Sequence, residues 1–484
     1  MKSINYQDVL NQYSKEDNDA IEQRFLDVQT QLNKKIIVLD DDPTGVQTVH
    51  DINVYTNWDQ KSIEQGFDEE NSMFYILTNS RGCTENETIN LHQEIAKNII
   101  AVSKKKKKEF ILISRSDSTL RGHYPIETEI LKKVIERTSE TKYDGEIIIP
   151  FFAEGGRYTI DGMHFVREEE LLIPVAETEF SKDKTFGYEN SNLAAWVEEK
   201  TQGKYLSESV KIITLKMLRD RDYNSVLTIL NTTNGFDKIV VDALTYEDVK
   251  VFTTCLIESI NEGKNFMFRT AASFAKIIGG VSDKDLLTQD ELFQNNNNGG
   301  IVIVGSHVKK TTEQIEFLRE KCNALAYIEF DVHKILSRTN IDQEINKYVD
   351  YIETHIEKGI TTVIYTTRKL KDTYTTDKEK MLMISIKVSE ALTQVISKLS
   401  IRPRFIVAKG GITSSDIGTK GLVVHKAKVV GQIIKGVPVW KLGPESKYPN
   451  LYYVIFPGNV GQKNGLFEVL DKINKNGGKH EIKK

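Results

Sequence analysis

Three adjacent carboxylates follow an apolar run near the N-terminus. In the segment IIVLDDDPTGVQT, Asp40, Asp41 and Asp42 come directly after a run typical of a buried strand, and Pro43 and Gly45 indicate a turn. Carboxylates this close repel one another, so the cluster requires a cation, a positive side chain or a shared proton. A plain Asx turn would need no chemistry. We favour a functional site, because open α/β sheets bind ligands beyond the carboxyl ends of their strands.

The same residues have the spacing of a rival chemistry. Asp40, Asp42 and Thr44 follow the D-x-D-x-T pattern of haloacid-dehalogenase-like phosphohydrolases, in which the first Asp is the nucleophile and the second the acid/base. In FYILTNSR, Thr78 and Asn79 come directly after the strand-like run FYIL, which resembles the second motif of that superfamily. A final acidic pair is also needed, and its best candidates lie far downstream in VVDALTYEDV. This hydrolase remains an alternative.

A second polar group follows the strand-like run FILI. The segment SRSDSTLRG contains Arg115, Asp117, Ser118 and Arg121, so one strand-to-helix turn holds two guanidinium groups, a carboxylate and a hydroxyl. A guanidinium pairs bidentately with a carboxylate or phosphate, which a lysine cannot do. An internal salt bridge to Asp117 would explain either arginine alone, but the whole group favours a pocket for a small polyhydroxy anion. The end of the preceding strand adds Asn79 and Arg81.

Three glycine turns follow strand-like runs in the second half of the chain. IVIV leads into GSH, FIVA into KGGITSSD, and YYVIF into PGNVG. Such turns present unpaired N–H groups to phosphate, although each also serves as an ordinary helix cap. Neither a Walker A sequence nor G-x-G-x-x-G occurs. The candidates for nucleotide binding are therefore the turn residues Gly305, Ser306 and His307, the segment from Lys409 to Asp416, and Gly458, Asn459 and Gly461.

Short apolar runs must position these groups, and they alternate with polar or helical stretches along the chain. This alternation predicts an α/β protein with two α/β domains, mostly parallel sheets and a ligand cleft between the domains. The polar run QNNNNGG predicts a linker at 294–299 between an N-terminal domain, 1–293, and a C-terminal domain, 300–484. A long helix is expected over 377–399. The expected strands are 36–39, 74–77, 110–113, 146–150, 238–242, 301–304, 361–366, 405–408 and 452–456.

Composition excludes several classes of protein. The 484 residues include 65 Lys and Arg against 69 Asp and Glu, and a net charge of −4 argues against a nucleic-acid binder. No run approaches the roughly 18 apolar residues of a membrane span. The three cysteines are far apart, so neither a zinc site nor a disulfide framework is supported, and no metal-ligand set is assigned. With its polar N-terminus, the chain is expected to be cytoplasmic.

These motifs together resemble the four-carbon acid sugar kinase family. The family's A-D-D-x-T-G is similar to residues 40–45, with Asp40 in place of alanine. Its S-D-S-T-L-R-G is present at 116–122 and its F-R-T-A-A-S-F at 268–274. Its G-G-x-T-S-x-D is present at 410–416 and its G-N-x-G at 458–461. An ordered set of motifs over most of the chain is far more specific than the three-residue hydrolase spacing.

The resemblance implies a sugar-acid-binding N-terminal domain and an ATP-binding C-terminal domain. Phosphate would pass to the terminal hydroxyl of threonate, erythronate or a 3-oxo-tetronate, and Ser306, 410–413 and Gly458 match positions that bind ATP. Our hypothesis is a kinase that uses Mg and ATP on a small acid sugar, its expected partner. A sugar-acid sensor without catalysis is a further alternative. The oligomeric state stays open, with a homo-oligomer among the options.

Within that hypothesis the residues take definite roles. Asp41 or Asp42 accepts the proton of the attacking hydroxyl or holds Mg, and Lys409 is a candidate for neutralising phosphate charge. The substrate-binding candidates are Asn79, Arg81, Arg115, Asp117, Ser118 and Arg121. The three arginines among them would hold the substrate carboxylate and help to orient its hydroxyls.

Overall fold

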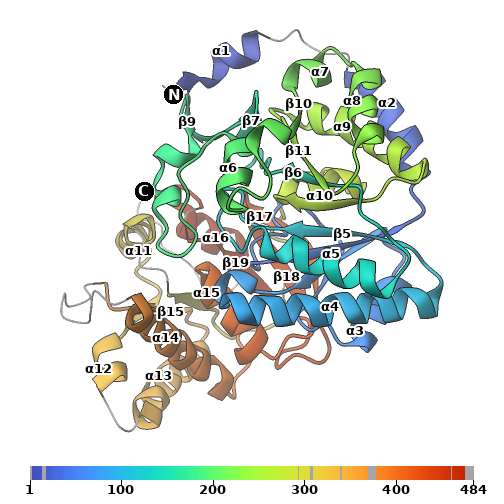
Figure 1. The fold of residues 1–484 in the computed structure, drawn as a ribbon. Coiled ribbons are helices and arrows are strands. Elements are labelled where there is room, and N and C mark those ends of the chain that lie inside the picture. The colour runs from blue at the N-terminus through green and yellow to red at the C-terminus, as the bar shows by residue number, and fades with distance from the viewer. Residues whose placement is uncertain are drawn as a thin grey trace. The chain divides into compact units, whose positions relative to one another are not determined.

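The structure is a computed structural model, shown in Figure 1. It describes residues 3–12, 18–292, 294–305, 309–337, 341–368, 378–458 and 460–474. The chain forms two compact units: Met1–Thr48 with Asn57–Ser282, and Val49–Thr56 with Asp283–Lys484. No helix among the described residues is long and apolar enough to cross a membrane.

A parallel sheet forms the centre of the first unit. Its strand order is β10-β11-β6-β12-β5-β2-β4, and every neighbouring pair runs parallel. All five strands expected in this half are confirmed, whereas β10 and β12 were not expected. The strands are β2 (Lys35–Asp40), β4 (Met73–Leu77), β5 (Phe110–Arg115), β6 (Gly145–Ile149), β10 (Lys211–Ile213), β11 (Asp237–Val241) and β12 (Phe266–Thr270).

Two groups of helices pack beside this sheet. One group comprises α3 (Gln60–Asp68), α4 (Glu85–Lys106) and α5 (Ile126–Thr138), of which α4 and α5 lie side by side (Figure 1). The other comprises α2 (Asn18–Gln29), α7 (Leu215–Arg219), α8 (Tyr223–Thr232), α9 (Tyr246–Asn261) and α10 (Ala272–Ile278). The lysine run 104–108 ends α4, as expected of a solvated helix end: Lys105 and Lys106 pair with Glu64, at 2.8 and 3.1 Å.

A small antiparallel sheet follows β6 where the sequence indicated only loops. Its order is β1-β9-β8-β7, with β1 (Ile4–Asn5), β7 (Arg157–Ile160), β8 (Met163–Glu168) and β9 (Leu171–Pro174). Short helical turns η2 (Val175–Glu177) and η3 (Glu179–Lys182) come next, then α6 (Leu193–Lys200) and η4 (Ser207–Ser209). The N-terminal strand β1, continued by α1 (Tyr6–Asn11), thus extends a sheet formed 150 residues later.

The second unit has a mixed sheet of order β3-β17-β18-β19-β16-β13-β15-β14. From β19 to β14 the neighbours run parallel, and from β3 to β19 they run antiparallel. The strands are β3 (Ile52–Tyr55), β13 (Ile301–Val304), β14 (Ala326–Phe330), β15 (Thr362–Thr366), β16 (Ile406–Lys409), β17 (Lys426–Ile434), β18 (Val437–Leu442) and β19 (Tyr452–Phe456). The helical segments are α11 (Lys309–Lys321), α12 (Val332–Ser337), α13 (Ile341–Ile356), α14 (Lys378–Lys398), α15 (Gly411–Asp416), η5 (Ile417–Gly421) and α16 (Gly465–Asn474).

The division between the units differs from the expected linker at 294–299. Leu287 and Leu292 are buried in the core of the second unit, so the chain joins that core well before residue 294. The glycines of QNNNNGG are themselves packed: a Cβ on Gly299 would lie 2.1 Å from the carbonyl oxygen of Ile360. The two glycines of this run thus stand where the backbone passes close to its neighbours.

Candidate functional site

The carboxyl edge of the first unit's sheet gathers the polar residues that the sequence singled out. Asp40 ends β2, and the strand register sets it opposite Arg115 on β5 and Leu77 on β4. Thr78, the next residue after β4, donates its backbone N–H and its hydroxyl to the carbonyl oxygen of Asp40, at 2.8 and 2.9 Å. Three neighbouring parallel strands therefore end at one place, where loops from each supply the functional groups.

Asp40 lies beneath this edge and is almost completely buried, at 1% exposed. Its Oδ1 accepts a charged hydrogen bond from Arg115 at 3.0 Å, while its Oδ2 is buried without a partner. Burial raises the pKa of Asp40 to about 7, although Arg115 opposes the shift. A Cβ on Gly45 would lie 2.0 Å from Oδ1, so only glycine leaves room for this carboxylate. A buried, enclosed carboxylate is poorly placed to attack phosphorus, so the geometry does not support the hydrolase alternative.

Asp41 is held by a bidentate arginine. Arg81, in the turn η1 (Ser80–Gly82), donates to both carboxylate oxygens of Asp41, at 2.7 and 3.1 Å. Ser116 donates to Asp41 at 3.1 Å, and Arg115 lies 3.5 Å away. Burial raises the pKa of Asp41, with Arg81 opposing it. Arg115, a candidate for binding substrate, is therefore ion-paired with both Asp40 and Asp41.

Asp42 occupies a more open place beside the same arginine. Its Oδ1 accepts the backbone N–H of Thr44 at 2.8 Å, and its Oδ2 lies 3.5 Å from Arg81. The side chain of Asp42 is 13% exposed, compared with 2% for Asp41. Of the three adjacent carboxylates, Asp42 is the one best placed to meet a ligand.

The loop after β5 forms a second ion-paired group. Arg121 donates to both oxygens of Asp117, at 2.8 and 3.3 Å, and Thr119 also donates to that carboxylate. Burial alone would raise the pKa of Asp117, but Arg121 and Arg81 hold it well below its usual range. Ser118 lies beside it and is buried. Asn79 adopts the left-handed conformation after β4, with its Oδ1 buried and without a partner.

Three residues that support this loop were not identified from the sequence. His164, on β8, donates from Nε2 to the carbonyl oxygen of Ser118 at 2.8 Å and contacts the Thr159 hydroxyl through Nδ1 at 2.9 Å. Tyr188 donates to the carbonyl oxygen of Thr119 at 2.7 Å. Arg269, on β12, donates to the carbonyl oxygen of Asp117 at 2.9 Å. Of the three, only Arg269 lies in a family motif, FRTAASF, which could have identified it from the sequence.

In the second unit, the ends of β13 and β16 approach each other closely. A Cβ on Gly305, after β13, would lie 2.1 Å from the hydroxyl of Thr413. Gly410 has φ +119°, a conformation that disfavours any side chain, and its N–H donates to the carbonyl oxygen of Phe456 on β19 at 2.9 Å. The structure therefore brings the KGGIT segment together with the other two glycine turns. Gly411 begins α15, and Ile412 is exposed.

Lys409 differs from the role expected of it. Its ammonium group is buried, donates to the carbonyl oxygen of Pro457 at 3.0 Å and stands 3.8 Å from the centre of the Phe456 ring. Burial lowers the pKa of Lys409 to about 6. The side chain thus ties β16 to the turn after β19. On that turn, the carbonyl oxygen of Gly458 accepts from Thr311 at 3.2 Å. Ser306 lies outside the described residues.

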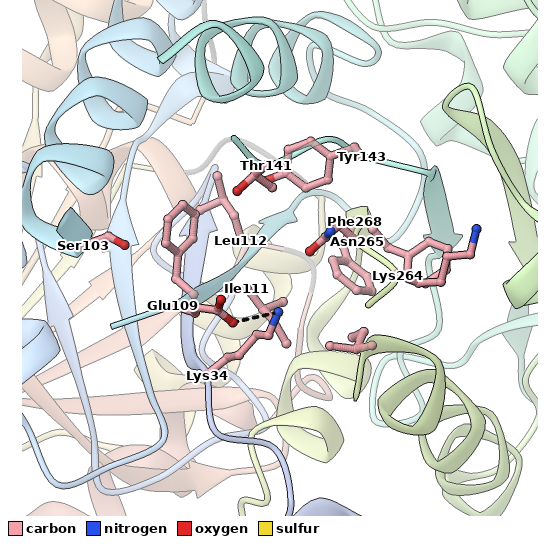
Figure 2. Close-up of a pocket in the computed structure, with 13 residues that line it drawn as sticks. Lys34, Ser103, Glu109, Ile111, Leu112, Thr141, Tyr143, Lys264, Asn265 and Phe268 are labelled. Carbon is pink, nitrogen blue, oxygen red and sulfur yellow. Dashed lines mark ion pairs between the residues drawn. The ribbon is translucent and has the colours of Figure 1, made fainter. Parts of the chain in front are cut away.

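A cavity of about 110 Å³ lies at the opposite, amino edge of the first unit's sheet (Figure 2). Lys34, one of its two lysines, pairs with Glu109 at 3.1 Å, as the dashed line shows. The other, Lys264, bonds to Asp144 at 3.2 Å. Phe110 and Phe266 mark the starts of their strands, so the cavity is remote from Asp40. The candidate site described above, at the carboxyl edge, is therefore separate from this cavity.

Comparison with known families agrees with this division of the chain. The sugar-binding N-terminal domain family matches residues 36–278, and the nucleotide-binding C-terminal domain family matches residues 301–466. Together these are the architecture that the motifs indicated. This chain belongs to the four-carbon acid sugar kinase family. The carboxylate and arginine cluster therefore lies in the sugar-binding domain of the family, and the glycine turns lie in its nucleotide-binding domain.

Solved structures show the same fold at low sequence identity. A Haemophilus influenzae protein of the DUF1537 family is 18% identical, with a TM-score of 0.58 over 90% of this chain and 99% of its own. A Salmonella typhimurium LT2 protein that carries the provisional name tRNA synthase is 16% identical, with a TM-score of 0.63 over 91% of this chain and 100% of its own. No curated protein matches the chain. These likenesses confirm the expected α/β fold.

The buried histidine predicts a pH dependence of stability. Burial lowers the pKa of His164 from 6.5 to about 4, so between these values the unfolded chain binds a proton that the folded protein does not. The free energy of unfolding should therefore be highest above pH 6.5 and should decrease as the pH falls to 4. For a pKa shift of this size the decrease is about 3 kcal/mol at most. Urea unfolding of the wild type and His164→Gln across this range measures it.

The variant His425→Gln, at an exposed position, controls for the loss of a histidine. The free energy of unfolding of His164→Gln should fall less steeply than that of the wild type or His425→Gln. Parallel curves for all three proteins would show that His164 takes up its proton equally in the folded and unfolded states.

Proposed function

We propose that the protein is a kinase that uses Mg and ATP to phosphorylate the terminal hydroxyl of a four-carbon acid sugar. The observation that carries the proposal is the pair Asp41 and Asp42: one carboxylate locked by Arg81, the next one open beside it. This pair stands at the ligand-binding edge of a sugar-binding domain, in a chain that also has a nucleotide-binding domain. Threonate, erythronate and a 3-oxo-tetronate are the candidate substrates.

In this proposal Asp42 is the base. It would accept the proton of the attacking hydroxyl, while Asp41 holds Arg81 in place to orient the substrate. Asn79, Asp117, Ser118 and Arg121 would surround the sugar hydroxyls. The carboxylates repel one another less because Arg81 and Arg115 lie among them.

The nucleotide would bind at the three glycine turns of the second unit. The turns that contain Gly305, Gly410 and Gly458 would meet the phosphate oxygens, and exposed Ile412 would offer an apolar contact. Lys409 would position the Gly458 turn through Pro457. The reaction requires the terminal phosphate of ATP to reach the hydroxyl that the first unit holds, with water excluded.

Magnesium fits this site as an ion carried by the nucleotide. No group of three or more metal-ligating side chains occurs in the part of the chain that the structure describes, and Mg²⁺ commonly uses one or two carboxylates together with phosphates. Because Asp42 is the base in this proposal, the phosphates of the nucleotide would hold the ion. When bound, the ion would neutralise charge on the transferred phosphoryl group.

Substrate-dependent release of ADP tests the function. Purified protein with Mg and ATP should form ADP in the presence of one stereoisomer of threonate, erythronate or a 3-oxo-tetronate, and little in its absence. A parallel assay offers the corresponding sugar phosphates without ATP and measures phosphate release. Release in that second assay alone would instead identify a phosphohydrolase, and binding of acid sugar without either reaction would identify a sensor.

Variants of two neighbouring aspartates test the proposed base, Asp42, against Asp40, which is buried and has no proposed role in catalysis. Asp42→Asn removes the base and should lower kcat by about 10² to 10⁴. Asp40→Asn, its matched control, should keep kcat within about threefold, because Asp40 is buried and the family motif has alanine there. Steady-state kinetics with the active acid sugar measures both. Full turnover by Asp42→Asn would remove it as the base, and loss of turnover in Asp40→Asn would revive the hydrolase nucleophile.

A pair of glycines tests the nucleotide site. Gly410→Ala places a side chain at φ +119° and should raise the KM for ATP about tenfold or more while acid-sugar binding stays unchanged. Gly418→Ala is the matched control in the same segment, because its Cβ would meet its nearest neighbour at an ordinary 3.4 Å. Calorimetric titration with ATP and with the acid sugar measures both. Equal ATP affinity in the two variants would place the nucleotide elsewhere.

A further inference from the structure

The arginines that the sequence singled out are already neutralised. Arg81 pairs with Asp41 and lies 3.5 Å from Asp42, and Arg115 pairs with Asp40 at 3.0 Å. Arg121 pairs in the same way with Asp117, at 2.8 Å. An acid sugar carries a carboxylate of its own, and a carboxylate taken from water into a partly buried site needs a cation that is not already committed.

Arg157 is such a cation. Its guanidinium forms no ion pair and no hydrogen bond with any residue in the described ranges, and its Nε is buried without a partner. It stands 5.6 Å from the centre of the Phe180 ring, the same ring that Arg121 approaches to 5.1 Å. Burial lowers the pKa of Arg157, and Asp117 and Arg121 are the charged groups close enough to affect this pKa: Asp117 raises it and Arg121 lowers it. Arg157 therefore lies beside the Asp117 loop, half-buried and unpaired.

The backbone around Arg157 is firmly held. Arg157 and Phe152 exchange both of their backbone hydrogen bonds, at 2.9 and 3.1 Å, which closes the turn that contains Gly155 and Gly156. A Cβ on Gly155 would lie 2.3 Å from the Phe152 ring and 3.2 Å from a terminal nitrogen of Arg157. A glycine here thus gives the guanidinium its space.

The hairpin that begins with Arg157 is also attached to the substrate loop. His164 lies on β8, opposite Thr159 on β7, and donates to the carbonyl oxygen of Ser118. This hydrogen bond connects the hairpin to the Asp117 loop. On its far side the hairpin sheet is extended by β1, and Tyr6 lies with its ring 5.2 Å from that of Tyr158. The position of Arg157 relative to Asp117 is therefore set by packing and not by an ion pair.

We propose that Arg157 binds the carboxylate of the acid sugar. The proposal rests on the function proposed above and adds to it the residue that distinguishes an acid sugar from a neutral sugar of the same length. The planar fork of a guanidinium donates two parallel hydrogen bonds to a carboxylate, which suits a group that carries one delocalised negative charge. Arg81 and Arg121 then orient hydroxyl groups through the carboxylates they hold.

The test compares the active acid sugar with its amide. The amide keeps every hydroxyl but replaces the carboxylate by a neutral group, so it serves as the probe of carboxylate recognition. In Arg157→Gln, kcat/KM for the acid sugar should fall about 100-fold or more, while kcat/KM for the amide should stay within about threefold. The preference of the wild type for the acid should therefore largely disappear, with the KM for ATP unchanged.

Two further variants make the result specific. Arg157→Lys keeps the charge without the fork and should retain part of the preference, and it also serves if Arg157→Gln does not fold. Arg167→Gln is the matched control: Arg167 lies on β8 of the same hairpin, where it pairs with Glu170 at 3.3 Å and stacks on Tyr6, away from the substrate loop. It should keep the wild-type preference.

The outcomes separate this proposal from the proposed function. A wild-type enzyme that phosphorylates an acid sugar, with the acid-to-amide preference unchanged in Arg157→Gln and Arg157→Lys, would overturn the role of Arg157 alone. Equal losses on acid and amide would show that Arg157 is merely structural. A wild-type protein that phosphorylates no acid sugar at all would overturn the function and this proposal together.

Discussion

The burial of opposite charges at one edge of a parallel sheet is the constraint on which the first unit depends. Asp40, Asp41 and Asp117 lie among Arg81, Arg115 and Arg121, and these side chains are largely removed from water. Removing ions from water costs several kcal/mol per ion unless each finds a partner in good geometry. β2, β4 and β5 must therefore end together, and the loops that follow must close over one another. The parallel register, in which Asp40 stands opposite Arg115, meets that requirement.

The same neutralisation decides what is left for a ligand. Asp42 keeps an accessible carboxylate because Arg81 is largely committed to Asp41. Arg157 keeps an uncommitted guanidinium because a hairpin sheet, rather than an acidic partner, holds it beside Asp117. In the proposed function, Asp42 would serve as the base and Arg157 as the cation that binds the anionic sugar. The supporting contacts of His164 and Tyr188 go to backbone carbonyls, so they set the loop without changing its charge.

The candidate site of the second unit is formed by glycine turns and not by ion-paired side chains. In the proposed function, the turns after β13, β16 and β19 would meet the negative charge of the phosphates with backbone N–H groups in place of a set of ion pairs. Close packing explains the glycines: the neighbour of Gly305 is the Thr413 hydroxyl, and Gly410 adopts a conformation that disfavours side chains. Lys409 is used inside the unit, where it joins two of the turns through Pro457. The unit also takes β3 from the N-terminal part of the sequence, which pairs with β17.

Local sequence determined the strands that are apolar throughout, the helix after residue 377, the family and the two groups of site residues, because each is carried by neighbours in the chain. β12 escaped detection because the buried Arg269 interrupts its apolar run; that arginine is tolerated since it donates to the carbonyl oxygen of Asp117, 152 residues away. The partners of Arg115 and Lys409, and the unpaired Nε of Arg157, were likewise apparent only from the tertiary structure. A charged side chain can form an ion pair within the protein or remain available to a ligand. Which of the two occurs depends on the distant residues that the fold places beside it, and a local sequence pattern does not contain that information.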